Sequence, residues 1–388
     1  SKASSGRIFV MIITRNQKKE EIQNTPITTS YDAVIVGAGF GGMYMLYRLR
    51  ELGLKVKVFE AGGDVGGTWY WNRYPGARCD VESMQYSYSF SEELEQEWEW
   101  SEKYAPQPEI LRYAGYVAEK FELRSDIIFN TRVISTIFDD DENHWVISTD
   151  RNDPVTARFC VLAVGCLSSA NRPAFENLAK FKGQQFHTGE WPHEGVDFTG
   201  QDVAIIGTGS SAIQSIPLIA QQARSLTVFQ RTANYSVPAW NSKMDLEYQE
   251  KIKADYPKLR AQARGRPSGV MFPFNFQSAL EPRKEERDKI YEEFWGRGGL
   301  PFLGAFSDLL FDAKANETAA EFARNKIRLI VKNQKTADLL CPKNVFGCKR
   351  LCVDSGYFET FNKENVRLVD ISTNPIREFD KDGLHVKD

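Results

Sequence analysis

The sequence has few of the residues that mark disulfide-rich or metal-binding proteins. Its 388 residues include only six cysteines and four histidines. No two cysteines form a Cys-x-x-Cys pair, and six are too sparse for a disulfide framework in a chain of this length. The histidines have no partners at metal-ligand spacing. We therefore expect reduced thiols, a cytoplasmic protein and no bound metal.

Long apolar runs and a one-sided charge are also absent. The apolar stretch at residues 7–14 is too short for a secretory signal, and no small-residue cleavage site follows it. No run reaches transmembrane length. A net charge of −3 offers no electrostatic basis for binding nucleic acid or an anionic membrane. We expect neither as a partner, and residues 1–30 are predicted to be a flexible arm.

What the sequence does contain is the same βαβ pattern twice. In the first copy, residues 31–60, the β-branched run at 33–36 predicts a buried parallel strand. A helix is expected from about residue 39 to residue 53, where a glycine ends it, and residues 55–59 predict the next strand. The second copy covers residues 202–230.

The rest of the chain is less regular. Residues 66–90 have neither a helical nor a strand period, and long aromatic-rich segments of this kind are usually functional. Residues 241–340 are charged and helix-favouring, which indicates a mainly helical insertion. Strand-like patterns are found around 127–137, 145–149, 158–165, 348–358 and 366–372.

These patterns predict an α/β fold with two dinucleotide-binding, Rossmann-like domains and a mainly helical insertion. Residues 31–168 are expected to form the first half of one dinucleotide-binding domain. Residues 169–240 would begin the second such domain, 241–340 would be the insertion, and 341–388 would return to the second domain.

The first glycine motif lies between a predicted strand and a predicted helix, as a dinucleotide site requires. Gly37 permits a tight turn, Gly39 lets the backbone approach a pyrophosphate, and Gly42 lets helix and strand pack closely. The free N–H groups of the helix N-terminus suit the phosphates. Glu60 ends the second strand, where its carboxylate can accept hydrogen bonds from a ribose, so this site suits FAD or NAD.

The second motif, Gly207-Thr208-Gly209-Ser210-Ser211-Ala212, differs in its strand end. There the carboxylate is replaced by Arg231 and Thr232. A guanidinium grips a 2′-phosphate that a carboxylate would repel, so this site suits NADP, although an arginine at a strand end can also be a mere surface charge. A chain that holds both nucleotides is most simply a flavoprotein that takes hydride from NADPH.

A twelve-residue stretch between the two units carries a more specific signal. Residues 181–192, FKGQQFHTGEWP, resemble the fingerprint of type I Baeyer–Villiger monooxygenases, with Phe181, Gly183, His187, Trp191 and Pro192 at its positions. Residues 64–83 resemble that family's flavin loop, and residues 347–351 resemble its segment with the catalytic arginine. A redox Cys-x-x-Cys pair is missing, which argues against a flavin disulfide reductase.

The resemblance implies an enzyme that uses FAD, NADPH and O2 to insert oxygen beside the carbonyl of a small ketone, giving an ester or lactone. Arg350 would stabilise the flavin peroxide and then the tetrahedral adduct, and Asp80 would position that arginine. Without the resemblance, Lys349 and Arg350 would read as a surface basic pair. His187 is expected to link the NADP position to domain orientation rather than to act as an acid or base.

We expect the cofactor contacts to lie in or beside these motifs. Lys349 would join the arginine at the NADP 2′-phosphate, and the flavin loop would contact FAD. The full predicted set is Gly37, Gly39, Phe40, Gly42, Glu60, Gly67, Thr68, Trp69, Arg78, Cys79, Asp80, Tyr86, Val133, Gly207, Thr208, Gly209, Ser210, Ser211, Ala212, Gln214, Arg231, Thr232 and Lys349.

Two features leave alternatives open. Members of the family usually continue past residue 388, so the second half of the FAD domain is expected to be absent from this chain, as a fragment or as a natural truncation. A nitrogen- or sulfur-oxidising flavin monooxygenase shares the two-nucleotide layout, and a truncated chain could be a non-catalytic NADP-binding protein. A monomer or weak homo-oligomer is expected.

Overall fold

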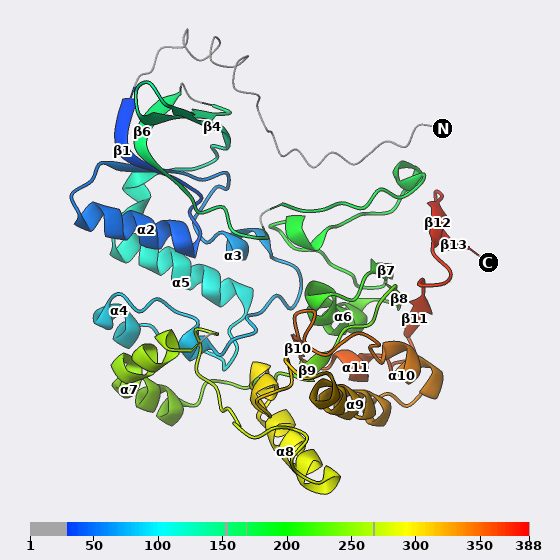
Figure 1. The fold of residues 1–388 in the computed structure, drawn as a ribbon. Helices are drawn as coiled ribbons and strands as arrows, with labels where there is room; N and C mark the ends of the chain where they lie inside the picture. The colour runs from blue at the N-terminus through cyan, green and yellow to red at the C-terminus, as the bar shows by residue number, and fades with distance from the viewer. Residues whose placement is uncertain (1–28, 152–153, 168, 267, 388) are drawn as a thin grey trace. The chain divides into compact units, whose positions relative to one another are not determined.

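The computed structural model describes residues 29–151, 154–167, 169–266 and 268–387, which divide into two compact units (Figure 1). The first unit is made of Ser1–Gly67 and Ala114–Cys166, and the second of Thr68–Tyr113 and Leu167–Asp388. The predicted arm therefore lies outside the described residues except for Thr29 and Ser30, which already belong to the first strand.

The first unit is built on a six-stranded sheet with the order β3-β2-β1-β6-β5-β4. Strands β1, β2, β3 and β6 are parallel, whereas β4, β5 and β6 form an antiparallel meander. The run Ala33–Ile35 is fully buried, as its apolar sequence predicts. The elements are β1 (Thr29–Val36), α2 (Phe40–Glu51), β2 (Val56–Phe59), η2 (Leu123–Asp126), β3 (Ile127–Ile128), β4 (Val133–Asp139), β5 (His144–Thr149) and β6 (Val155–Leu162).

The structure corrects the sequence-based strands here in one respect. The stretch 127–137 is not a single meander strand, because β3 pairs in parallel with β2 and only β4 joins the meander. Helix α5 (Gln107–Lys120) was also not predicted. It buries Ile110, Tyr113, Ala114, Val117 and Ala118, a spacing that places one apolar stripe on the helix.

The second unit contains the second βαβ copy and most of the helices. Strands β7 (Asp202–Ile206), β8 (Ser225–Gln230) and β11 (Val366–Asp370) form a parallel sheet in the order β11-β8-β7. Helix α6 (Ser210–Gln222) connects β7 to β8. Both predicted βαβ units are thus present, which confirms the two Rossmann-like folds.

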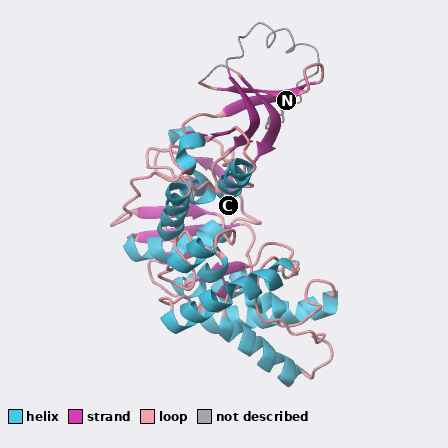
Figure 2. Ribbon diagram, turned by 90° about the vertical axis from the view of Figure 1, so that its left-hand side faces the viewer, coloured by secondary structure: helices cyan, strands magenta, loops and turns pink. Residues whose placement is uncertain are grey.

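Residues 241–340 of the second unit are mainly helical; Figure 2 draws all helices of the chain in cyan and all strands in magenta. Their helices are α7 (Leu246–Arg264), α8 (Lys284–Arg297), η5 (Leu300–Gly304), α9 (Ala313–Ile330) and α10 (Gln334–Leu340). An aromatic core forms around the fully buried Tyr291. The ring centroids of Phe302 and Phe306, which are also buried, lie 5.7 Å and 5.1 Å from that of Tyr291. Aromatic packing holds α8, η5 and α9 together.

The irregular segment 66–90 contains two short helices that the sequence did not predict, α3 (Thr68–Trp71) and η1 (Ser83–Gln85). The predicted strand at 348–358 is shortened to β10 (Cys352–Asp354), which pairs in parallel with β9 (Ser236–Pro238). The remaining elements are α4 (Glu92–Glu97), η3 (Leu178–Lys180), η4 (Thr188–Glu190), α11 (Tyr357–Thr360), β12 (Ile376–Phe379) and β13 (Leu384–Val386).

The first glycine loop shows why glycine is needed at its third position. Gly37 has a φ of +102°, a region that side chains disfavour. A Cβ added to Gly42 would lie 1.9 Å from the carbonyl oxygen of Gly37. The first turn of α2 therefore packs directly on the end of β1, and no larger residue fits without moving one of them.

The substitution Gly42→Ala is expected to destabilise the protein by about 1–3 kcal/mol, because the added methyl group must push α2 off the glycine loop. Gly41→Ala is the matched control, since a Cβ at the neighbouring exposed position meets no atom within 4 Å. It is expected to leave stability unchanged or to raise it slightly. Chemical denaturation of both variants checks this, and equal midpoints for the two would contradict the packing argument.

Candidate active site

The end of β2 holds a carboxylate against the first glycine loop. Glu60 is only 5% exposed; its Oε2 accepts a hydrogen bond from the N–H of Ala38 and its Oε1 one from the N–H of Gly62, both at 2.6 Å. A Cβ on Gly67 would lie 2.8 Å from the Cα of Gly39. The glycine loop thus packs backbone to backbone against the start of the flavin loop, and the Glu60 carboxylate bonds to backbone N–H groups beside it.

This loop fits a dinucleotide. Helix α2 begins after Gly39 with no side-chain cap and no acidic residue in its first turn, so its N–H groups suit an anion. Only glycine lets the backbone come this close to a pyrophosphate. Val133, another predicted contact, is the first residue of β4.

The second glycine loop is tied to the segment that follows β8. The hydroxyl of Thr208 donates to the carbonyl of Thr232 at 2.9 Å, and the Asn234 side chain donates to the carbonyl of Thr208 at 2.8 Å. Helix α6 begins after Gly209 without a side-chain cap, which again suits an anion. Sequence reasoning missed Asn234, and its place three residues after Arg231 was the only available signal.

At the end of β8 a buried glutamine is followed by an exposed arginine. Gln230 is buried and donates through Nε2 to the carbonyl of Leu339 at 2.7 Å. Arg231 and Thr232, which follow it, are exposed. Lys349 is exposed as well, and within the described part of the chain neither it nor Arg231 forms an ion pair with a carboxylate. A free guanidinium at this strand end suits a phosphate.

Two residues that are far apart in the sequence meet in an ion pair. The Nη2 of Arg350 lies 2.9 Å from the Oδ2 of Asp80, whose side chain is 7% exposed while that of Arg350 is 68% exposed. Burial raises the pKa of Asp80, and the charge and hydrogen bond of Arg350 oppose that rise. The carboxylate is thus sequestered, and the guanidinium it holds faces outward.

Helix α6 holds the Asp80 segment in place. Gln214 on this helix donates to the carbonyl of Arg78 at 3.1 Å and approaches Asp80 at 3.5 Å, while its Oε1 accepts from the hydroxyl of Tyr74 at 2.8 Å. A Cβ on Gly76 would lie 2.3 Å from the carbonyl oxygen of Gln214. The helix that opens the second nucleotide loop therefore also positions the acid.

Other predicted flavin-loop residues lie around this pair. Thr68 is exposed at the start of α3, and the indole of Trp69 donates to the hydroxyl of Tyr86 at 3.0 Å. Burial raises the pKa of Tyr86 to about 12 and that of Cys79 to about 12, so both stay protonated at neutral pH. Arg78 pairs with Glu102 and also donates to the carbonyl of Tyr104.

The fingerprint segment contacts the second glycine motif. Nδ1 of His187 accepts the N–H of Gly189 at 3.1 Å, and the hydroxyl of Ser211 donates to that of Thr188 at 3.2 Å. Trp191 is buried against Phe198. A Cβ on Gly183 would lie 2.4 Å from the ring of Phe181, which explains the glycine between them. His187 is therefore engaged in a local turn.

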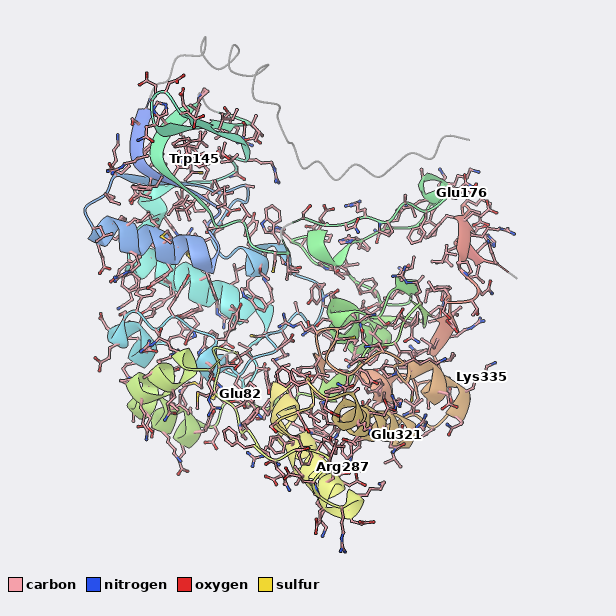
Figure 3. All side chains as sticks on the ribbon, in the orientation of Figure 1. Glu82, Trp145, Glu176, Arg287, Glu321 and Lys335 are labelled. Atoms are coloured by element: carbon pink, nitrogen blue, oxygen red, sulfur yellow. The ribbon has the colours of Figure 1, made fainter. Side chains whose placement is uncertain are left out.

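A cavity of about 380 Å³ adjoins Asp80. Its walls are the segment 80–85, helix α7, the loop 269–273 and the start of η5, and most of the lining is apolar or aromatic. Glu82, labelled in Figure 3, accepts a hydrogen bond at 2.9 Å from Tyr248 of helix α7. This size and lining are typical of a small-molecule site. The sequence showed no sign of it, since α7 and the loop are far from Asp80 along the chain.

The described residues contain no group of three or more His, Cys, Asp or Glu side chains that could hold a metal ion. None of their helices is long and apolar enough to span a membrane.

Comparisons with known proteins agree with this geometry. Residues 34–259 match the family described as pyridine nucleotide-disulphide oxidoreductase. A Baeyer–Villiger monooxygenase of Pseudooceanicola batsensis is 40% identical over 95% of this chain and 68% of its own length. A phenazine N-monooxygenase of Lysobacter antibioticus is 41% identical over 93% of this chain and 67% of its own.

Solved structures give the same result. An oxidised steroid monooxygenase bound to NADP superposes with a TM-score of 0.90 at 54% identity, over 92% of this chain and 69% of that one. The chain thus spans about two thirds of the relatives that it matches. It belongs to the Baeyer–Villiger monooxygenases, flavoproteins that use FAD, NADPH and O2 to convert ketones into esters or lactones.

Proposed function

We propose that Arg350 is the catalytic cation of this enzyme and that Asp80 positions it. The observation that carries the proposal is the ion pair itself, in which a buried carboxylate that lines a cavity holds an exposed guanidinium. Bound FAD, once reduced by NADPH, supplies the electrons that activate O2. An arginine suits this place because it keeps its charge at any working pH.

The pair also explains why an acid is needed. A guanidinium that stabilises developing negative charge on oxygen must not reorient during the reaction. Asp80 is fixed by burial and by its neighbours on helix α6, so it restricts the guanidinium to one direction. Without the cation, the buried carboxylate would have no counter-charge, and its pKa would rise further.

We assign the cofactors to the two glycine loops. The loop from Gly37 to Gly42 with Glu60 would hold the adenosine and pyrophosphate of FAD. The loop from Gly207 to Ala212 would hold NADP, with Arg231, Thr232 and Lys349 at its 2′-phosphate. The uncapped helix starts and the exposed guanidinium support this assignment.

The domain boundaries follow from the same assignment. FAD would bind a domain whose first half is residues 31–168. NADP would bind residues 169–240 and 341–388, and the helices of 241–340 would be inserted between the two parts. The strand order of each sheet supports this division.

The cavity beside Asp80 is the proposed ketone site. Its lining is largely apolar, which favours a ketone with an apolar frame. We further propose a cytoplasmic monomer or weak homo-oligomer that binds no nucleic acid or membrane. The six free cysteines, three of them buried, are consistent with a reducing compartment.

Oxidation at nitrogen is a second candidate function, because one relative at 41% identity is a phenazine N-monooxygenase. The permanent cation beside the cavity favours the ketone reaction, in which negative charge develops on oxygen. A visible flavin absorption spectrum separates both oxygenases from a non-catalytic NADP-binding protein.

Replacing the cation tests its role. Arg350→Ala is expected to slow ester or lactone formation from a cyclic ketone by at least about 100-fold, because the developing oxyanion loses its counter-charge. Reduction of the flavin by NADPH should stay close to the wild-type rate. Stopped-flow absorbance and gas chromatography measure the two steps.

Arg377→Ala is the control, because this arginine is exposed and pairs only with the neighbouring Glu378. It should behave like wild type. Lactone formation by Arg350→Ala at the wild-type rate would refute the catalytic role. Loss of flavin reduction in the same proportion would point to a folding or binding defect.

Arg231 is expected to decide between NADP and NAD. NADP+ should raise the melting temperature of the wild-type protein more than NAD+ does at equal concentration, since only a ligand of the native state stabilises it. Arg231→Ala should weaken NADP+ binding by about 10- to 100-fold, the usual range for a lost charged hydrogen bond.

Arg224→Ala serves as the matched control for this experiment. Arg224 is an exposed arginine just before β8, at the opposite end of the strand, and pairs with Asp202. It should leave the preference for NADP+ intact. Equal shifts with both nucleotides in the wild-type protein would contradict the assignment of the second site.

A further inference from the structure

One wall of the cavity beside Asp80 is a short loop, residues 269–273, which we call the pocket loop. Val270, Met271, Phe272 and Pro273 of this loop line the cavity together with Gly269. The loop belongs to no helix or strand, so its position depends on a small number of side-chain and backbone contacts. Those contacts decide the shape of the cavity.

The side-chain amide of Gln85 makes two hydrogen bonds to one residue of the pocket loop. Its Nε2 donates to the carbonyl oxygen of Met271, and its Oε1 accepts the N–H of Met271, each at 2.6 Å. The amide thus uses its donor and its acceptor on both backbone polar groups of Met271, as a residue of a neighbouring strand would. Met271 takes part in this contact only through its backbone, so the contact depends on the side chain at position 85.

The backbone around Gln85 is itself held by hydrogen bonds from helix α7. It ends the short helix η1, five residues after Asp80, and its own carbonyl accepts from Arg260 of helix α7 at 3.1 Å. Arg260 also binds the hydroxyl of Ser87 at 2.6 Å and pairs with Glu95 at 2.9 Å, and all these groups are largely buried. Tyr256 donates to the carbonyl of Met84 at 2.9 Å. The glutamine therefore holds the pocket loop to a rigid wall.

The far end of the pocket loop has a separate anchor. A Cβ on Gly304 would lie 2.5 Å from the carbonyl oxygen of Pro273 and 3.3 Å from the ring of Phe272. The near end begins at Gly269, whose φ is +68° and whose Cβ would meet no atom within 4 Å. Gly304 thus packs closely against the far end of the loop, and the Gln85 pair holds its middle at Met271.

We propose that Gln85 is a specificity-determining residue, which sets the size of ketone that the cavity accepts by fixing Met271. The proposal rests on the cavity being the ketone site. Gln85 itself lines the cavity, and it acts by positioning Met271 rather than by touching the reacting atoms. An apolar ketone long enough to reach the pocket loop would contact it, whereas a small ring beside Asp80 would not.

The test compares two ketones that share one ring, cyclohexanone and 4-phenylcyclohexanone, in the full-length protein. Gln85→Met keeps the length of the side chain and removes both hydrogen bonds. It is expected to raise KM for 4-phenylcyclohexanone about tenfold, the value of one or two net hydrogen bonds. kcat for both ketones and KM for cyclohexanone should stay close to wild type.

Two further variants make the result specific. Gln85→Glu keeps the acceptor for the N–H of Met271 and loses the donor, so it should fall between wild type and Gln85→Met. Gln96→Met is the matched control, because Gln96 also bonds a backbone carbonyl, that of Lys253 on helix α7, but lies outside the cavity lining. It should change neither KM. An unchanged ratio of the two KM values in Gln85→Met, or an equal rise for both ketones, would overturn the proposal.

Hydrogen–deuterium exchange gives a readout that does not depend on turnover. The amide of Met271 should exchange faster in Gln85→Met than in wild type, and it should be unaffected in Gln96→Met. Unchanged exchange would show that the glutamine does not hold the loop. If the wild-type protein forms no lactone from either ketone, the proposed function fails, and the exchange rates still report on the contact between Gln85 and Met271.

Discussion

A carboxylate that is removed from water needs a cation beside it, and the Asp80–Arg350 pair is where that constraint shapes this protein. Asp80 is buried, so folding must bring a positive charge to it. The charge comes from a segment near the other end of the chain. The guanidinium stays exposed on its far side, so the contact that gives the acid its counter-charge leaves the other face of the cation open to solvent.

The pair depends in turn on close backbone packing. Gly76 approaches the carbonyl of Gln214 so closely that no side chain fits, and Gln214 contacts the carbonyl of Arg78 and the carboxylate of Asp80. Helix α6 thus begins at the second glycine loop and continues past the acid. A shift of this helix would therefore affect both the nucleotide loop and the direction of Arg350.

The segment 80–87 is a second point on which several functions meet. It starts with the acid, continues with Gln85 against the pocket loop, and includes Tyr86, which accepts from Trp69. Side chains of helix α7 bind its backbone at two places. In this way the helical insertion, which has no nucleotide motif of its own, fixes the groups around the cavity.

The local sequence determined the two βαβ units, the glycine positions and the contrast between Glu60 and Arg231, because each is decided by neighbours along one strand–loop–helix unit. Asp80 and Arg350 were identified only through a family resemblance, since a lysine–arginine pair has no period or spacing that separates it from a surface charge. Helix α5, the division of residues 127–137, the Gln85–Met271 contact and the cavity were decided by tertiary packing. They join segments that are far apart in the chain, and such contacts depend on how apolar faces are buried together, which no short stretch of sequence records.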